Sequence, residues 1–97
     1  MIVIHVQVSV EPARRNEFLD LARKEVEASH SNPGCVKYAC LEDVREQNAF
    51  TFYEEWESQQ AFDAYVNSEK FQKMSAAYKA LMAAPPQSSY YTATLLS

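Results

Sequence analysis

The feature that most constrains this chain is the order in which two hydrophobic periodicities follow one another. Residues 2–10 alternate apolar and polar side chains with period two, which indicates a half-buried strand that Glu11-Pro12 ends. From Arg14 to about His30, apolar side chains recur every three or four residues, which predicts an amphipathic helix. The run Ser31-Asn32-Pro33-Gly34 stops that helix.

Both periodicities return in the second half of the chain. Two strands are predicted at Cys35–Glu42 and Ala49–Trp56, and the short polar connection between them favours a hairpin. Helical spacing then resumes near Gln59, with Ser58 as its N-cap and with Ser68 as a second cap after a break. The second helical region therefore consists of two segments that follow each other closely.

The last predicted strand completes the fold class. Pro85-Pro86 ends the helical region, and Tyr90–Leu96 is predicted as the final strand. With right-handed crossovers, the order β-α-β-β-α-(α)-β predicts one ferredoxin-like α+β domain over residues 1–97. Its antiparallel sheet would carry helices on one face only. We expect Val3, Tyr38 and Tyr53 on the open face, where a second copy of the chain would cover them in a homodimer.

The net charge of the chain and its N-terminal segment argue against several classes of partner. The net charge is −4 at pH 7, and Lys and Arg are scattered, so we expect neither a nucleic-acid nor a membrane partner. The apolar start, MIVIHVQVSV, is too short to span a membrane and lacks the basic region of a signal peptide. We therefore expect a cytoplasmic protein.

The sequence offers no pattern for a cofactor or a metal. Gly34 is the only glycine, so there is no Gly-rich phosphate loop. Cys35 and Cys40 match neither CxxC nor a zinc pattern, and we expect them to be free thiols on opposite faces of one strand. His5 is expected on the sheet surface, an interface or a pocket mouth, and His30 at a helix end, so these two histidines do not form a metal site.

Strand Ala49–Trp56 carries the strongest candidate for chemistry. Alternation places Phe50, Phe52, Glu54 and Trp56 on one face, so a carboxylate lies among three aromatic side chains. Burial raises the pKa of a carboxyl group, which would suit Glu54 as a general acid or base near neutral pH. Alternatively, Glu54 forms a structural ion pair or reaches solvent at the end of the strand.

Other aromatic side chains are candidates for the wall of a pocket. The chain has six Tyr, five Phe and one Trp, more than a core of this size usually needs. Tyr65 would face the sheet one helical turn from Phe62 and could donate a hydrogen bond to a substrate oxygen, or could simply pack in the core. We group Glu54, Tyr65 and Trp56 as candidate catalytic residues, and as candidate substrate-binding residues Phe50, Phe52, Phe62 and Tyr78.

Three sequence runs, Phe52–Ser58, Ala61–Tyr65 and Ser68–Phe71, together with Asn32–Cys35, resemble the antibiotic biosynthesis monooxygenase family. The resemblance covers essentially the whole chain, and its Tyr-Glu-x-Trp motif is Tyr53–Trp56. It implies a dimeric ferredoxin-like domain of the dimeric α/β barrel superfamily, with a pocket between the sheet and the helices. Many members carry His-x-x-x-x-His on the second helix, and those positions here are Tyr65 and Lys70.

The resemblance and the residues together favour a cofactor-independent monooxygenase of a small quinol-like or phenolic substrate. Two alternatives remain open at this point. One is an isomerase or proton-transfer enzyme acting on a small carbonyl compound, and the other is a dimeric module that binds a small molecule without converting it.

Overall fold

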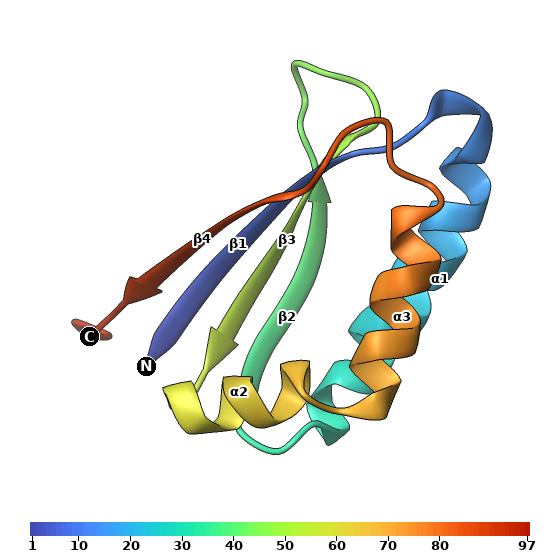
Figure 1. Ribbon diagram of the computed structural model, residues 1–97. Coiled ribbons are helices and arrows are strands. Elements are labelled where there is room, and N and C mark those ends of the chain that lie inside the picture. The colour runs from blue at the N-terminus through green and yellow to red at the C-terminus, as the bar shows by residue number, and fades with distance from the viewer.

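A computed structural model describes all 97 residues of the chain (Figure 1). It contains four strands, three α-helices and two short 3-10 turns, and all of the helices lie on one side of the sheet. In chain order the elements are β1 (Ile2–Ser9), η1 (Pro12–Arg14), α1 (Arg15–Ala28), η2 (Ser29–Ser31), β2 (Cys35–Glu42), β3 (Ala49–Trp56), α2 (Gln59–Val66), α3 (Glu69–Lys79) and β4 (Gln87–Thr92).

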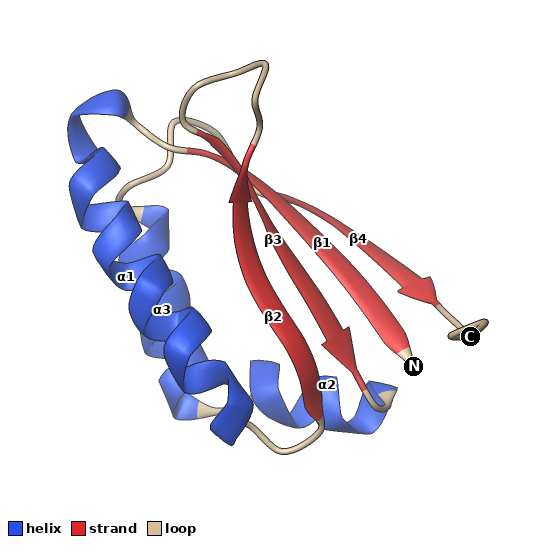
Figure 2. Cartoon of the chain, turned by 180° about the vertical axis from the view of Figure 1, so that it is seen from behind, coloured by secondary structure: helices blue, strands red, loops and turns tan.

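The strands form one antiparallel sheet in the order β2-β3-β1-β4. This arrangement confirms the predicted ferredoxin-like α+β fold. Figures 1 and 2 show α1 and α3 side by side across one face of the sheet, with α2 near the end where β3 finishes. We call this the helix-covered face, and no helix packs on the opposite, open face. No helix is both long enough and apolar enough to cross a membrane.

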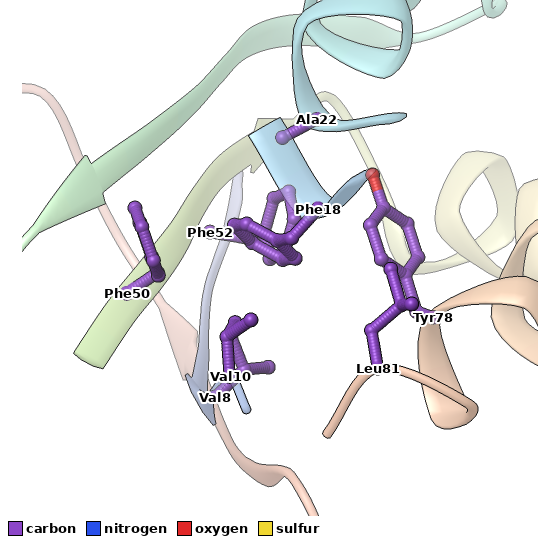
Figure 3. Close-up of a cluster of buried hydrophobic side chains, with 8 residues drawn as sticks. All are labelled: Val8, Val10, Phe18, Ala22, Phe50, Phe52, Tyr78 and Leu81. Atoms are coloured by element: carbon purple, nitrogen blue, oxygen red, sulfur yellow. The ribbon is translucent and has the colours of Figure 1, made fainter. Parts of the chain in front are cut away.

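The main core lies between the helix-covered face and helices α1 and α3 (Figure 3). Phe18 of α1 is fully buried, and its ring centroid lies 4.6 Å from that of Phe50, 5.8 Å from that of Phe52 and 5.7 Å from that of Tyr78. Burying each such side chain stabilises the fold by about 1.5–3 kcal/mol. The aromatic stripe of β3 thus holds α1 and α3 against the sheet.

The helix boundaries follow the capping signals in the sequence. The Ser58 side chain accepts a hydrogen bond from the Ala61 backbone N–H at 3.1 Å, and Ser68 accepts one from that of Phe71 at 3.2 Å. Both caps were predicted, and they satisfy amide groups that a helix leaves free in its first turn. The sequence therefore specifies the break between α2 and α3 through the second cap, Ser68.

The last strand was placed wrongly by the sequence pattern. The structure has β4 at Gln87–Thr92 instead of residues 90–96, paired with β1 from Gln7↔Gln87 to Ile2↔Thr92. The polar run 87–89 has low β-propensity, but pairing with β1 overrides it, because backbone hydrogen bonding does not depend on the side chain. Leu95 and Leu96 lie beyond the strand and are exposed.

A bulge in β2 overturns two further predictions. Cys35 pairs with Trp56 and Lys37 with Glu55, so Val36 is an extra residue that shifts the alternation by one position. Cys35 and Cys40 consequently both face the helices, although strict alternation put them on opposite faces. Tyr38 also lies on the helix-covered face, where it packs against the core, and not on the open face.

Candidate functional site

A cavity of about 250 Å³ lies between the helix-covered face and helices α2 and α3. Its lining comes from all four strands and both helices, and 12 of its 17 residues are hydrophobic. The polar groups of the wall are few, which is typical of pockets that bind small, largely apolar molecules. Among the lining residues are Val6, Tyr38, Phe52, Glu54, Phe62, Tyr65, Phe71, Met74, Ser75, Tyr78, Lys79, Ser88 and Tyr90.

Glu54 is the carboxyl group of this cavity. It lies in the middle of the sheet, opposite Ile4 of β1 and Tyr38 of β2, and only 4% of its surface is exposed. Its Oε1 atom accepts a hydrogen bond from the Trp56 Nε1–H at 2.9 Å, and no Lys or Arg forms a salt bridge with it. The structural ion pair considered from the sequence is therefore absent.

The surroundings of Glu54 raise its pKa to about 7. Burial is the main cause, the hydrogen bond from Trp56 opposes it, and the negative charge of Glu25 adds to it. A carboxyl group with a pKa near 7 can accept or donate a proton at neutral pH, as a general base or acid requires. Alternation along β3 predicted this placement.

Two tyrosine hydroxyls lie beside this carboxyl group. The Oη atoms of Tyr38 and Tyr65 are 3.4 Å apart, which is a long hydrogen bond. Burial raises the pKa of both phenols well above 10, so both remain protonated at neutral pH. The hydroxyl that does not donate to the other can therefore donate a hydrogen bond to a ligand oxygen. Tyr38 was missed because the bulge in β2 reverses the face on which alternation places it.

Glu25 of α1 is a second buried carboxyl group, and it too was missed. Its exposed fraction is 4%, and its Oε1 atom has no hydrogen-bond partner. Burial raises its pKa, while the Lys70 charge and the Tyr65 hydroxyl lower it. The signal was available, since Glu25 occupies a position on the apolar stripe of α1 between Ala22 and Ser29, which are both buried.

The structure gathers most of the predicted site residues around the cavity, but not all of them. Phe52, Glu54, Phe62, Tyr65 and Tyr78 line it. Trp56 and Phe50 do not line the cavity, and each packs elsewhere in the core.

Trp56 is fully buried behind Glu54, where its ring packs 4.8 Å from that of Tyr65, centroid to centroid. Phe50 packs on Phe18, with the Arg15 guanidinium 5.5 Å from its ring centroid. We therefore leave Phe50 out of the proposed substrate site and treat Trp56 as the hydrogen-bond donor that holds Glu54.

The histidines lie outside the cavity. His5 is on the open face between Tyr53 and Tyr91, with ring centroids 5.5 Å and 5.4 Å away, and His30 is exposed just after α1. No group of three or more His, Cys, Asp or Glu side chains comes together in a way that could hold a metal ion. Among the cavity side chains, Glu54 can transfer a proton, and Tyr38 and Tyr65 can take part in hydrogen bonds.

Comparison with known proteins gives a consistent result. The family model described as antibiotic biosynthesis monooxygenase matches residues 1–77. An uncharacterized protein of Synechocystis is 32% identical over 93% of this chain, and the chain spans only 61% of that relative's length. YcnE of Bacillus subtilis, a proposed monooxygenase, is 34% identical over 88% of this chain and 90% of its own.

Solved structures agree on the fold. The crystal structure of a proposed antibiotic biosynthesis monooxygenase from Deinococcus radiodurans superposes with a TM-score of 0.92. The match covers 100% of this chain and 96% of that one, at 19% identity. At that identity the similarity supports the architecture, and the chemistry has to be argued from the cavity.

Proposed function

Because the chain belongs to the antibiotic biosynthesis monooxygenase family, we propose that it is a cofactor-independent monooxygenase of a small quinol-like or phenolic substrate. The observation that carries the proposal is Glu54, a buried carboxyl group with a pKa of about 7 in the wall of an aromatic-lined cavity. We further propose that residues 1–97 act as one domain.

The cavity favours a neutral and largely apolar substrate. Its carboxyl group carries no salt bridge, and the positively charged residue in its wall, Lys79, is exposed to solvent. An anionic substrate would meet the charge of Glu54 in a site of low dielectric constant, where like charges repel strongly. A phenol avoids this repulsion, and its ring can pack on Phe52, Phe62 and Phe71.

In the proposed reaction the substrate supplies the electrons. Glu54 accepts a proton from the bound substrate, and the resulting electron-rich anion forms a carbon–oxygen bond with O₂. Of Tyr38 and Tyr65, the hydroxyl that does not donate to the other donates a hydrogen bond to the substrate oxygen, where negative charge collects. In the balanced form, the phenol O–H, a ring C–H and O₂ give a quinone and water: the ring carbon forms a hydroperoxide, and its O–O bond breaks as the second proton is lost from that carbon.

Oxygen uptake with a panel of quinols and phenols tests the proposal. Wild-type protein should consume one O₂ per substrate molecule converted. Glu54→Gln should lower turnover about 10²–10⁴-fold, the usual contribution of a positioned acid–base group. Glu27→Gln on α1 removes the same charge from an exposed position and should leave turnover unchanged.

The same experiment distinguishes the monooxygenase from the two alternative functions. An isomerase of a small carbonyl compound would use Glu54 and the two tyrosines without consuming oxygen. Saturable binding of a phenol with neither oxygen uptake nor product would indicate a binding module. Either outcome would refute the monooxygenase proposal.

We also propose that the protein works as a homodimer in the cytoplasm. The open face supports the dimer, because Val3, His5, Tyr53 and Tyr91 form an aromatic and apolar surface across β1, β3 and β4 that no helix covers. An exposed patch of this kind usually marks an interface. The two free thiols, Cys35 and Cys40, support a reducing compartment.

A further inference from the structure

The molecule buries two carboxyl groups on the same side of its sheet, and the proposed reaction uses only one. Glu54 enters from β3 and Glu25 from α1, and each is 4% exposed. Lys, Arg, Asp and Glu are almost never fully buried unless they are paired. Neither of these carboxyl groups takes part in a salt bridge, so two unpaired acids sit in one small domain.

The two acids and a hydrogen-bonded pair of tyrosines affect one another's ionisation. Tyr38 lies opposite Glu54 in the sheet, and its hydroxyl is 3.4 Å from that of Tyr65. The Tyr65 hydroxyl in turn acts on Glu25. The negative charge of Glu25 also raises the pKa of Glu54. The two acids are therefore neighbours in one poorly solvated compartment.

Few charges are available there to neutralise a second anion. The titratable groups that face the two acids are Tyr38, Tyr65, Tyr78 and Cys35, all uncharged when protonated. Lys70 is the one cation that acts on Glu25, and it is exposed. The Glu25 Oε1 and Tyr78 Oη atoms are both buried without a hydrogen-bond partner, so the compartment is short of groups that could stabilise charge.

We propose that Glu25 is a positioning residue of this site, whose carboxyl group shares protons with that of Glu54 as one coupled pair. Two buried acids without a counter-charge cannot both ionise at the usual pH, because the first charge opposes the second. Glu25 thereby keeps Glu54 able to hold a proton at neutral pH. This inference rests on the proposed role of Glu54 in the cavity.

Titration of selectively ¹³C-labelled Glu carboxyl groups by NMR tests the pair without any substrate. In wild-type protein the Glu54 resonance should titrate near neutral pH with a broadened or two-step curve. In Glu25→Gln, which keeps the shape of the side chain, the Glu54 midpoint should fall by about one pH unit, the coupling at which two groups titrate as a pair. The acid limb of the kcat/KM profile should move in the same direction.

Two further variants provide a matched control and an independent test of the coupling. Glu27→Gln removes an exposed carboxylate two residues away on α1 and should leave the Glu54 midpoint unchanged. Lys70→Gln replaces an exposed residue, so the variant should fold as the wild-type protein does. It should lower the Glu54 midpoint slightly, because Glu25 then ionises less readily and opposes Glu54 less.

An unchanged, single-step Glu54 titration in Glu25→Gln would overturn the inference. If that titration shifts as expected but no phenol is oxidised, the coupled pair stands and the monooxygenase proposal fails. If turnover is present and the midpoint does not move, the reverse holds. The two proposals can therefore be refuted separately.

Discussion

Replacing Glu54 by Gln should change the pH dependence of stability in a way that the burial of this residue dictates. Glutamine has nearly the same shape and keeps an oxygen that can accept from Trp56 Nε1, but it cannot ionise. The folded-state pKa of Glu54 is about 7, against an ordinary value of 4.5. Between these values the folded protein holds a proton that the unfolded chain releases.

The sign and size of the effect follow from that difference. Because the pKa is raised on folding, the protonated form stabilises the fold, and stability is lost as the pH rises towards and through 7. Each unit is worth about 1.4 kcal/mol, so complete ionisation costs about 3 kcal/mol. For a domain of this size that corresponds to roughly 10–20 °C in Tm.

Urea unfolding from pH 4 to pH 9 at a fixed protein concentration measures the effect. Near pH 4, Glu54→Gln and wild type should have similar unfolding free energies. At pH 9 the variant should be more stable by about 3 kcal/mol, because it has no carboxylate to bury. A difference between variant and wild type that does not change with pH would refute the assignment of Glu54 as a buried acid without a counter-charge.

Three further outcomes are expected. Sedimentation at micromolar concentration should give about twice the 11.1 kDa chain mass, and Tyr53→Glu on the open face should produce a monomer; a wild-type monomer would remove the dimer from the proposal. Cys35 and Cys40 should both react with a thiol reagent after denaturation without reductant, so one blocked thiol contradicts the reducing compartment. Gly34→Ala should lower the free energy of unfolding in urea by at least about 1–2 kcal/mol, because Gly34 has φ +81° and an added Cβ would collide with Ala61. An unchanged urea midpoint would mean that the turn can relax to accept the methyl group.

The parts of the fold that the sequence predicted well are those in which local signals agree. Alternation in β1 and β3, the caps Ser58 and Ser68, and the helix stop at Pro33-Gly34 all depend on a few adjacent residues. The parts that failed depend on distant partners. The position of β4 is set by pairing with β1, and the register of β2 by the bulge at Val36, neither of which a periodicity within the strand reveals.

The candidate site divides in the same way. Glu54 was found because regular alternation along β3 places it among aromatic side chains. Tyr38 was not predicted as a site residue, because the bulge shifts the register of β2 by one residue and moves every later side chain to the other face. Glu25 was visible on the apolar stripe of α1, but only the folded structure shows that it is buried and that the Tyr65 hydroxyl affects its pKa.

The two positions at which many relatives carry histidine gain a specific meaning from this arrangement. Here they are Tyr65 and Lys70, and these are the two residues that oppose the effect of burial on Glu25. Tyr65 also hydrogen-bonds to Tyr38 in the cavity wall. Burial raises the pKa of the Tyr65 phenol, so it stays protonated and cannot exchange protons near pH 7 as imidazole does. In this chain the exchangeable proton near neutral pH would therefore reside on Glu54, with Tyr65 and Lys70 affecting the ionisation of Glu25 and, through it, that of Glu54.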